Sequence, residues 1–269
     1  MAHDDELQLT RRYSNVSCYL RSMVRTKVEQ SRQQELFKPR GGKRPGAGRP
    51  RKQGRASERH QVRERFAARH PIHINIRVDP AVGQLRRRRA YKAFRDAMRM
   101  SLGRDDFRIV HVSLQREHIH LIVEASDAMA LARGMQSLEV SAARRLNSAI
   151  SIERGVPRRG RVFVDRYHAR VLKTPREVRN AINYVLNNWR HHREDTGFES
   201  MFWEIDPFSS AAGFKGWVNL TSTETPRDDL DEPDGRLPLP TALSQTWLMN
   251  IGWTKHGLLR VDHVPGPVE

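Results

Sequence analysis

The chain is poor in cysteine and aromatic residues and has no long apolar run. Cys18 is the only cysteine among 269 residues, which excludes an intramolecular disulfide and a cysteine-based zinc site and favours a reducing compartment. No apolar run approaches the roughly 18 residues of a membrane-spanning helix. The N-terminus, Met-Ala-His-Asp-Asp, lacks the pattern of a secretory signal. We therefore expect a cytoplasmic protein with no membrane-bound part.

Acidic residues are also in short supply. The chain has 31 Asp and Glu against 48 Lys and Arg, a net charge of +17. An excess of this size is typical of proteins that bind a polyanion, most often nucleic acid. Most of the cations are arginines, which bind phosphate through two parallel hydrogen bonds. The sequence thus predicts a nucleoid-associated protein, with a solvated basic surface as the alternative.

The charge divides the chain into three parts. Residues 1–70 hold 18 Lys and Arg but only 7 Asp and Glu, and we expect them to form a basic, largely flexible arm. Residues 71–195 carry regular apolar patterns and are expected to form a compact domain. Residues 196–269 form an extension, in which the acidic segment 221–240 is typical of a linker.

The arm contains a segment rich in glycine, proline and cations. Residues 38–55 include no apolar side chain larger than alanine, so this segment cannot bury a core. Gly48-Arg49-Pro50 with its flanking cations resembles an AT-hook, which lays an arginine along the narrow minor groove of DNA. A basic linker with loose phosphate contacts is the alternative. The DNA contacts expected here are Arg44, Arg49, Arg51 and Lys52.

Strand and helix patterns alternate through the compact domain. Period-two alternation predicts strands over 72–78, 107–114, 117–124 and, in one or two pieces, 162–172; helical spacing predicts helices over 81–101 and 127–149. The second and third strands are joined so tightly that they must form an antiparallel hairpin. The order βαββαβ predicts an α+β fold with a ferredoxin-like antiparallel sheet. A further helix follows over 174–191, with Thr174 and Glu177 placed as a capping box.

The two faces of the predicted sheet differ in character. One face is aliphatic, with Val110, Val112 and Leu114 from the second strand, and needs the first two helices to cover it. The opposite face is too polar to be core, and the last helix is free to cover it. This candidate active face gathers His73, Asn75, Arg77, His111, Ser113, His118 and His120.

His118 and His120 are the most informative pair on this face. They stand two residues apart on one strand, so both imidazoles point the same way, about 6–7 Å apart. Imidazole is a common ligand of divalent transition metals, and the pair is close enough to share one ion. One exposed and one packed histidine on an edge strand is the alternative.

Tyr184 and Asn188 lie together on one flank of the last helix, four residues apart and outside its apolar stripe. A tyrosine in this position can present its phenol near a metal held by the histidines, and Asn188 or its neighbour Asn187 can supply a third ligand. The phenol would then attack phosphorus in a phosphodiester. A surface tyrosine on an amphipathic helix is the alternative.

The sequence segments around these residues resemble those of a known family. Glu117-His118-Ile119-His120-Leu121-Ile122-Val123 resembles the HUH motif of single-tyrosine transposases, and Ala181-Ile182-Asn183-Tyr184-Val185-Leu186-Asn187-Asn188 resembles their tyrosine helix. With the arm string Gly41-Gly42-Lys43-Arg44-Pro45-Gly46-Ala47-Gly48-Arg49-Pro50, the chain looks closest to the REP-associated tyrosine transposases. Glu117 departs from the family pattern, in which an Asn often precedes the first histidine.

The resemblance implies a function. His118, His120 and Asn188 would hold Mg²⁺ or Mn²⁺, and Tyr184 would attack single-stranded DNA to form a 5′-phosphotyrosine and free a 3′-hydroxyl. The expected substrate is a DNA hairpin, and the resemblance also implies a possible homodimer. Further DNA contacts are expected at Arg77, Arg86, Arg87, Arg158, Arg159 and Arg161.

Two other classes stay open at this point. The first is a non-catalytic protein that binds DNA sequences or hairpins as a regulator. The second is a different His-x-His enzyme. Histidine-triad hydrolases need a third alternating histidine where Ile122 stands, whereas two-histidine phosphoesterases need a second pair, a form that His111-Val112-Ser113 matches.

Overall fold

The computed structural model describes residues 64–193, 203–220 and 237–266. All of them belong to one compact unit that runs from residue 57 to residue 269. The contacts expected at Arg44, Arg49, Arg51 and Lys52 lie outside the described residues, as do Cys18 and most of the acidic segment 221–240. None of the described helices is long and apolar enough to cross a membrane.

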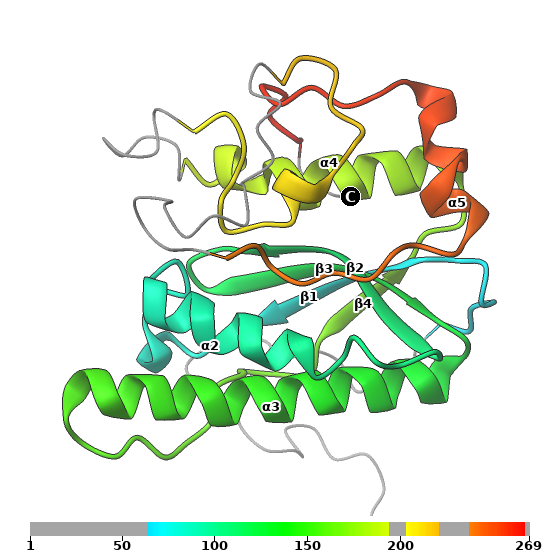
Figure 1. Ribbon diagram of the computed structural model, residues 1–269. Helices are drawn as coiled ribbons and strands as arrows, with labels where there is room; N and C mark the ends of the chain where they lie inside the picture. The colour runs from blue at the N-terminus through cyan, green and yellow to red at the C-terminus, as the bar shows by residue number, and fades with distance from the viewer. Residues whose placement is uncertain (1–63, 194–202, 221–236, 267–269) are drawn as a thin grey trace, which may run out of the picture. The chain divides into compact units, whose positions relative to one another are not determined.

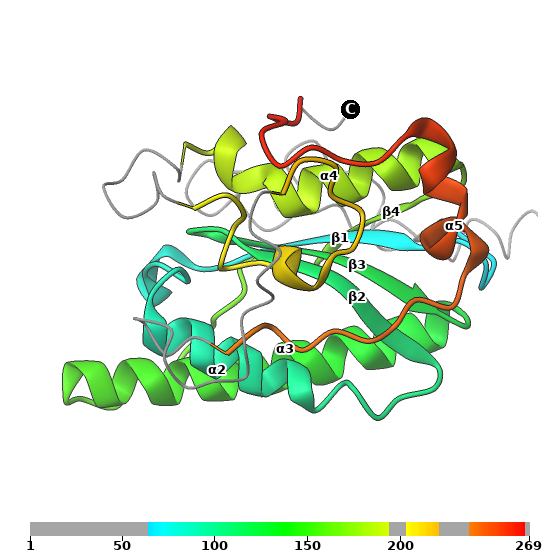
Figure 2. The ribbon, with the colours of Figure 1, turned by 45° about the horizontal axis from the view of Figure 1, so that its top comes forward.

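A four-stranded antiparallel sheet forms the middle layer (Figure 1). Its strands are β1 (Ile72–Arg77), β2 (Phe107–Leu114), β3 (His118–Ala125) and β4 (His168–Val171), in the order β2-β3-β1-β4. Helices α2 (Arg88–Arg99) and α3 (Ala128–Arg154) lie along one face, and α4 (Pro175–His191) lies along the other (Figure 2). The predicted ferredoxin-like α+β fold with an added tyrosine-bearing helix is therefore confirmed.

The main core fills the space between the sheet and the α2–α3 layer. The three isoleucines of β1 are fully buried there, and so are the alternate apolar residues of β3. The long helix α3 begins where Asp127 accepts hydrogen bonds from the amides of Met129 and Ala130, both at 2.8 Å. It ends at Gly155, whose φ of 68° few other residues adopt.

The helix expected over 81–101 is shorter than predicted. Pro80–Val82 form a single 3-10 turn, and α2 begins only at Arg88. Gly83 has a φ of 83°, which turns the chain out of any helix, and the amide of Leu85 donates to the carbonyl of Arg116 at 3.2 Å. These tertiary contacts override the apolar spacing of the segment.

A β-bulge corrects the predicted faces of β2. The register with β3 shifts between Ile109 and His111, so that Val110 is the extra residue. Ile109 consequently packs in the main core, whereas Val110 packs on the α4 side of the sheet. The prediction had placed Val110 on the wrong face, because strict alternation cannot anticipate a bulge.

Most of the extension packs on the domain. Phe208, Leu248 and Trp253 are buried, while Trp247 is 49% exposed. The chain also pairs with the outer edge of β2, since the amide of Ser210 donates to Val112 and that of Leu114 to Phe208, both at 2.9 Å. The extension thus covers an edge that would otherwise present free backbone groups. A homodimer could not use this part of the edge.

Helix α3 approaches β2 so closely at Gly134 that a larger residue does not fit. A Cβ atom at Gly134 would lie 2.2 Å from Cγ of Phe107, which is fully buried. We expect Gly134→Ala to lower the free energy of unfolding by about 1–3 kcal/mol, because the helix and the ring must move apart. Gly103→Ala is the matched control, since a Cβ there meets no atom within 4 Å. Equal unfolding curves for the two variants in urea would contradict the close packing.

Candidate active site

Helix α4 is fixed over the polar face of the sheet by its first turn and its apolar stripe. The predicted capping box is present: Thr174 Oγ1 accepts from the amide of Glu177 at 3.2 Å, and the Glu177 carboxylate accepts from the amide of Thr174 at 2.9 Å. Ile182 and Leu186 pack in a second apolar cluster that includes Ile122 of β3. This packing leaves Tyr184 half-buried beside the histidines of the sheet.

Tyr184 sits edge-on against two imidazoles. Its ring centroid lies 5.2 Å from that of His120 and 5.7 Å from that of His73, with interplanar angles of 89° and 72°. His73 and His120 stack on each other at 5.6 Å, and His118 and His120 lie nearly parallel at 6.3 Å. Three histidines and one phenol therefore share one small region, as the sequence predicted for Tyr184, His118 and His120.

Burial controls the protonation of this region. It lowers the pKa of His120 well below 6.5, with a further contribution from the charges of His73 and His118, and it also lowers the pKa of His118. Both imidazoles are thus held neutral at physiological pH, and the neutral form is the one that binds metal ions. Burial raises the pKa of Tyr184, so its phenol stays protonated unless a cation approaches.

The two asparagines that the sequence left open have different environments. Asn187 donates from its side-chain nitrogen to Asn183 Oδ1 and to the carbonyl of Arg260, both at 3.0 Å. Asn188 is fully buried, and neither its oxygen nor its nitrogen has a hydrogen-bond partner. Asn188 also lies one turn beyond Tyr184 on the same helix flank. Asn187 is therefore engaged with the extension through its nitrogen, although its Oδ1 is also buried without a partner, whereas neither polar atom of Asn188 has one.

The donor set at this site suits a divalent cation. Nδ1 of His120 and Oδ1 of Asn75, its register partner on β1, are also buried without hydrogen-bond partners. Buried polar atoms left unpaired are costly, and a cation would satisfy the imidazole and amide acceptors. Across residues 64–193, 203–220 and 237–266, no three His, Cys, Asp or Glu side chains gather to hold a metal. The unpaired amide oxygens of Asn75 and Asn188 could serve as ligands beside His118 and His120.

Two basic groups lie at the site, and only one of them, His192, was not predicted there from the sequence. His192, the C-cap of α4, is close enough to contribute to the lowered pKa of both His118 and His120. Arg77, expected as a DNA contact, is the register partner of His118 and also lowers its pKa. His192 follows Tyr184 and Asn188 at four-residue steps, a spacing that could have drawn attention to it.

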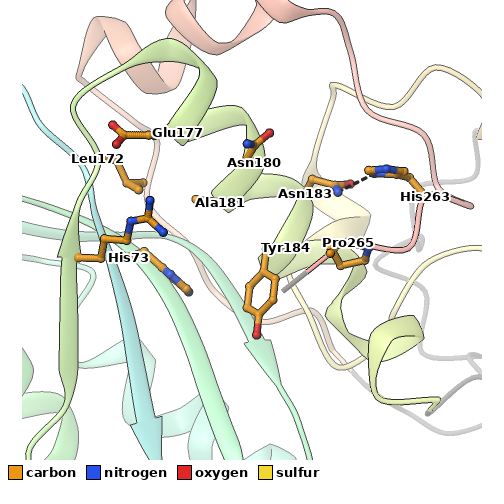
Figure 3. Close-up of a pocket in the computed structure, with 11 residues that line it drawn as sticks. His73, Leu172, Glu177, Asn180, Ala181, Asn183, Tyr184, His263 and Pro265 are labelled. Carbon is orange, nitrogen blue, oxygen red and sulfur yellow. Dashed lines mark hydrogen bonds between the residues drawn. The ribbon is translucent and has the colours of Figure 1, made fainter. Parts of the chain in front are cut away.

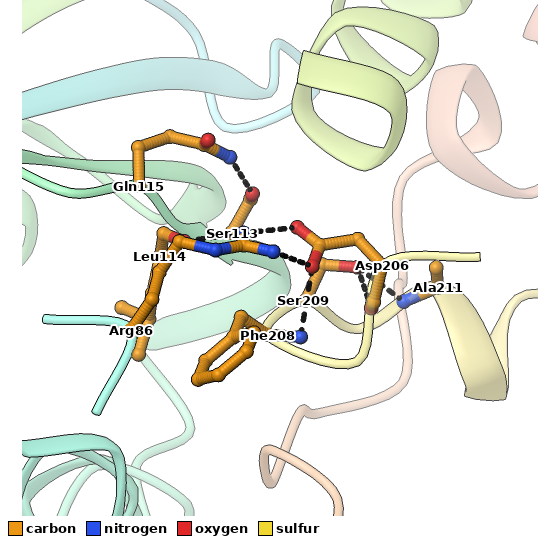
Figure 4. Close-up of polar contacts among 8 residues, drawn as sticks. All are labelled: Arg86, Ser113, Leu114, Gln115, Asp206, Phe208, Ser209 and Ala211. Atoms are coloured by element: carbon orange, nitrogen blue, oxygen red, sulfur yellow. Dashed lines mark hydrogen bonds and ion pairs between the residues drawn. The ribbon is translucent and has the colours of Figure 1, made fainter. Parts of the chain in front are cut away.

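Arg86 is excluded from the expected DNA contacts (Figure 4). Its side chain is 6% exposed, and its guanidinium donates to both carboxylate oxygens of Asp206, which is fully buried, at 2.9 and 3.0 Å. It also donates to the carbonyl of Leu114 at 3.1 Å and lies over the ring of Phe208. Arg86 therefore anchors the extension to the domain, a role that no local pattern indicates because its partner is 120 residues away.

The remaining predicted arginines lie apart from Tyr184. Arg87 is exposed and pairs with Glu153 at 3.3 Å, near the end of α3. The loop of Arg158, Arg159 and Arg161 folds back along α3, where Arg158 bonds to Asn147. Arg159 and Arg161 are exposed. These side chains stand on the α2–α3 side of the sheet, opposite α4.

The pair of His111 and Ser113 does not form an open site with the pair of His118 and His120. His111 is 9% exposed and packs edge-on against Phe214, with centroids 5.5 Å apart. Ser113 is fully buried and accepts from Gln115 Nε2 at 2.6 Å. A two-histidine phosphoesterase needs both pairs around a common cleft, so this alternative loses its support.

The buried histidines also predict how stability depends on pH. Burial lowers the pKa of His111 from 6.5 to about 4. Between these values the unfolded chain binds more protons, so the free energy of unfolding falls as the pH falls from 6.5 to 4. His111→Gln should reduce this slope by up to about 1.4 kcal/mol per pH unit. Urea denaturation across this range tests the prediction, and an unchanged slope would contradict it.

Comparisons with known proteins agree with this arrangement. Residues 70–188 match the family described as "Transposase IS200 like". Among solved structures, a REP-associated tyrosine transposase bound to a REP hairpin is similar, with 13% identity over 57% of this chain and 82% of that chain and a TM-score of 0.42. A candidate transposase from Deinococcus radiodurans R1 is similar with 16% identity over 44% of this chain and 87% of that chain and a TM-score of 0.32.

No curated protein matches the chain significantly. The matched family segment begins just before β1 and ends at Asn188, so it contains the whole sheet, the histidine pair and Tyr184. Residues 70–188 are therefore similar to the family of IS200-like transposases over the segment that holds the site.

Proposed function

We propose that this protein nicks and rejoins single-stranded DNA through a covalent bond between Tyr184 and a 5′-phosphate. The observation that carries the proposal is the position of Tyr184: its phenol ring lies against His120, within a segment similar to a family of transposases. An ordinary surface tyrosine would not stand among three histidines whose pKa values burial holds below 6.5.

The proposed step is a transesterification. The Tyr184 oxygen forms a bond to phosphorus, the bond from phosphorus to the 3′-oxygen breaks, and the products are a 5′-phosphotyrosine and a free 3′-hydroxyl. The reverse attack by a 3′-hydroxyl rejoins the strand, so no external energy source is needed. The phenol loses its proton to solvent in the forward step, and the leaving 3′-oxygen takes up a proton from solvent.

The side chains around Tyr184 would prepare this step. His118, His120 and Asn188 are the proposed ligands of Mg²⁺ or Mn²⁺, which when bound would polarise the phosphate and offset its charge. Neutral imidazoles favour such binding at physiological pH. Arg77, the register partner of His118, would contact the phosphate. A cation at this site would also favour the phenolate, which burial disfavours.

The substrate we propose is single-stranded DNA next to a hairpin. The net charge of +17 supports a polyanionic partner. The choice of a hairpin rests on the sequence resemblance to REP-associated tyrosine transposases.

A covalent-adduct assay tests the proposal directly. The full chain is incubated with 3′-labelled hairpin DNA that carries single-stranded flanks, in Mg²⁺, Mn²⁺ or EDTA. We expect a protein–DNA band that survives denaturation and that EDTA prevents. Tight binding without an adduct in either metal would instead favour a non-catalytic hairpin-binding regulator.

The basic arm should contribute to DNA affinity but not to catalysis. Deleting residues 38–55, which hold 8 Lys and Arg and no Asp or Glu, removes cations that can release counterions from DNA. We expect weaker binding and a shallower dependence of log Kd on log salt, measured by fluorescence anisotropy. Deleting the acidic segment 224–234 is the control, since it removes chain length but few cations. An unchanged salt slope after the first deletion would argue against the arm as a DNA contact.

A further inference from the structure

A segment of the extension runs beside α4 (Figures 1 and 2). Residues 257–263, which we call the strap, begin at Gly257, where a φ of 83° ends the 3-10 helix Gly252–His256. Several backbone carbonyls of the strap accept hydrogen bonds from α4 side chains. Directional contacts therefore join the strap to most of the length of the helix.

The first half of α4 contributes two of these side chains. Arg179 donates through Nε to the carbonyl of Gly257 at 2.8 Å and through a second nitrogen to that of Leu258 at 3.0 Å. Asn183 bonds to the ring of His263 at 2.7 Å, where the strap borders an open pocket beside Tyr184 (Figure 3). Both ends of the strap thus contact the helix.

The second half of α4 contributes two more. Asn187 donates to the carbonyl of Arg260 at 3.0 Å, and Arg190 donates through Nε to that of Val261 at 2.9 Å. Arg190 also donates to the carbonyl of Glu204 at 3.1 Å, in the part of the extension that precedes the strap. The helix is therefore bonded to the extension on both sides of Tyr184 along the chain.

These contacts define one of three stripes on α4, which lie roughly 120° apart at 100° per residue. The first stripe packs on the apolar residues of the sheet and consists of Val178, Ala181, Ile182, Val185 and Leu186. The second bonds to the strap and consists of Arg179, Asn183, Asn187 and Arg190. The third consists of Tyr184 and Asn188. Because the first two stripes are held by the rest of the chain, they fix the direction of the third.

The strap is itself tied to the sheet. Leu259 is fully buried, and its amide donates to the carbonyl of Gly216 at 2.9 Å. The amide of Val261 donates to Oδ1 of Asn219 at 3.0 Å. Both acceptors belong to residues 203–220, which pair with the outer edge of β2. The strap therefore relates α4 to the same sheet that carries the histidine pair.

We propose that the strap sets the rotation of α4 and that Arg179 is a positioning residue, which keeps Tyr184 and Asn188 directed at the histidine pair. Apolar packing is non-directional, whereas hydrogen bonds need narrow ranges of distance and angle. Loss of the Arg179 bonds would leave the first stripe packed and let the helix turn. The inference rests on the proposed function and gives the extension a part in it.

A small rotation is sufficient because side chains stand well away from the helix axis. They reach about 5–6 Å from the axis, so a rotation of about 10° moves the phenol oxygen of Tyr184 by about 1 Å. A misplacement of about 1 Å can slow a reaction between positioned groups by about 100-fold. The strap therefore controls the rate of attack, although none of its side chains is a proposed metal ligand.

The rotation of α4 can be measured without DNA or metal. 3-Fluorotyrosine is incorporated into the full chain, and the ¹⁹F resonance of Tyr184 is identified by its absence from Tyr184→Phe. The edge-on rings of His73 and His120 make this resonance sensitive to the position of the phenol. We expect Arg179→Met to shift it by more than its line width, and an unchanged resonance would overturn the proposal. Arg176→Met is the matched control and should shift nothing, because Arg176 is exposed on the same helix and makes no hydrogen bond to another described residue.

A second variant loosens the strap from its other side. Asn219→Ala removes the acceptor of the Val261 amide and leaves every side chain of α4 unchanged. It should shift the Tyr184 resonance in the same direction as Arg179→Met, and it carries the test alone if Arg179→Met does not fold. A resonance that Asn219→Ala leaves in place would show that the strap does not set the rotation, and the proposal would fail.

Kinetics connect the rotation to the chemistry. Both variants should slow adduct formation at saturating hairpin DNA by about 10- to 100-fold, while the DNA concentration for half-maximal rate stays within about twofold. A loss confined to DNA affinity would overturn the positioning role. Shifted resonances in a protein that forms no adduct in any metal would support control of α4 by the strap and overturn the proposed function alone.

Discussion

Tyr184→Phe is expected to abolish the covalent protein–DNA adduct and to lower DNA cleavage by at least about 10³-fold. The change removes only the phenol oxygen, the atom that would form the bond to phosphorus. The phenylalanine ring keeps the edge-on contacts with His73 and His120, so DNA affinity should stay within about twofold. Denaturing gels of labelled hairpin DNA measure the adduct, and anisotropy measures the affinity.

A second tyrosine provides the matched control. Tyr91 is buried on α2, on the opposite side of the sheet, and its hydroxyl donates to the carbonyl of Leu237 at 2.9 Å. Tyr91→Phe should lower stability by roughly 1 kcal/mol and leave the adduct intact. If Tyr184→Phe still formed an adduct that resists denaturation, another nucleophile would be at work and the proposed role of Tyr184 would fail.

Most of the site could be predicted from local sequence patterns. Period-two alternation puts His118 and His120 on the same face whatever the partner strands are, and the capping box fixes the start of α4 at Pro175. The four-residue step from Tyr184 to Asn188 likewise follows from helix geometry alone. These are short-range properties, and the structure reproduces them.

The features that these patterns did not predict depend on residues that are far apart in the sequence. The bulge at Val110 exists only in the register of β2 against β3. Arg86 belongs to a cationic run that resembles a phosphate-binding surface, yet it is buried against Asp206, far along the chain. The contacts between α4 and the strap join residues that are 71 to 80 positions apart in the chain. No spacing within a single element encodes such contacts.

Removal of the proposed metal ligands is the second large effect that we expect. His120→Ala should abolish cleavage while retaining most of the DNA affinity, because affinity comes mainly from phosphate contacts made by cations elsewhere. His120 is 2% exposed and its Nδ1 has no hydrogen-bond partner, so the loss of the ring removes a potential ligand without breaking a hydrogen bond of that atom. Equal losses of cleavage and affinity would mean that the histidine is structural.

Variants of Asn187 and Asn188 test which of the two asparagines is the third metal ligand. Asn188→Ala should raise the Mn²⁺ concentration needed for half-maximal cleavage by at least about 10-fold, as expected for a lost metal partner. Asn187→Ala should instead lower stability, because Asn187 bonds to Asn183 and to the carbonyl of Arg260, and should leave the Mn²⁺ requirement unchanged. Direct Mn²⁺ binding, followed by electron paramagnetic resonance, should weaken in Asn188→Ala alone. If Asn187→Ala weakens Mn²⁺ binding and Asn188→Ala does not, the third ligand is Asn187, and α4 must rotate toward the histidines when metal binds.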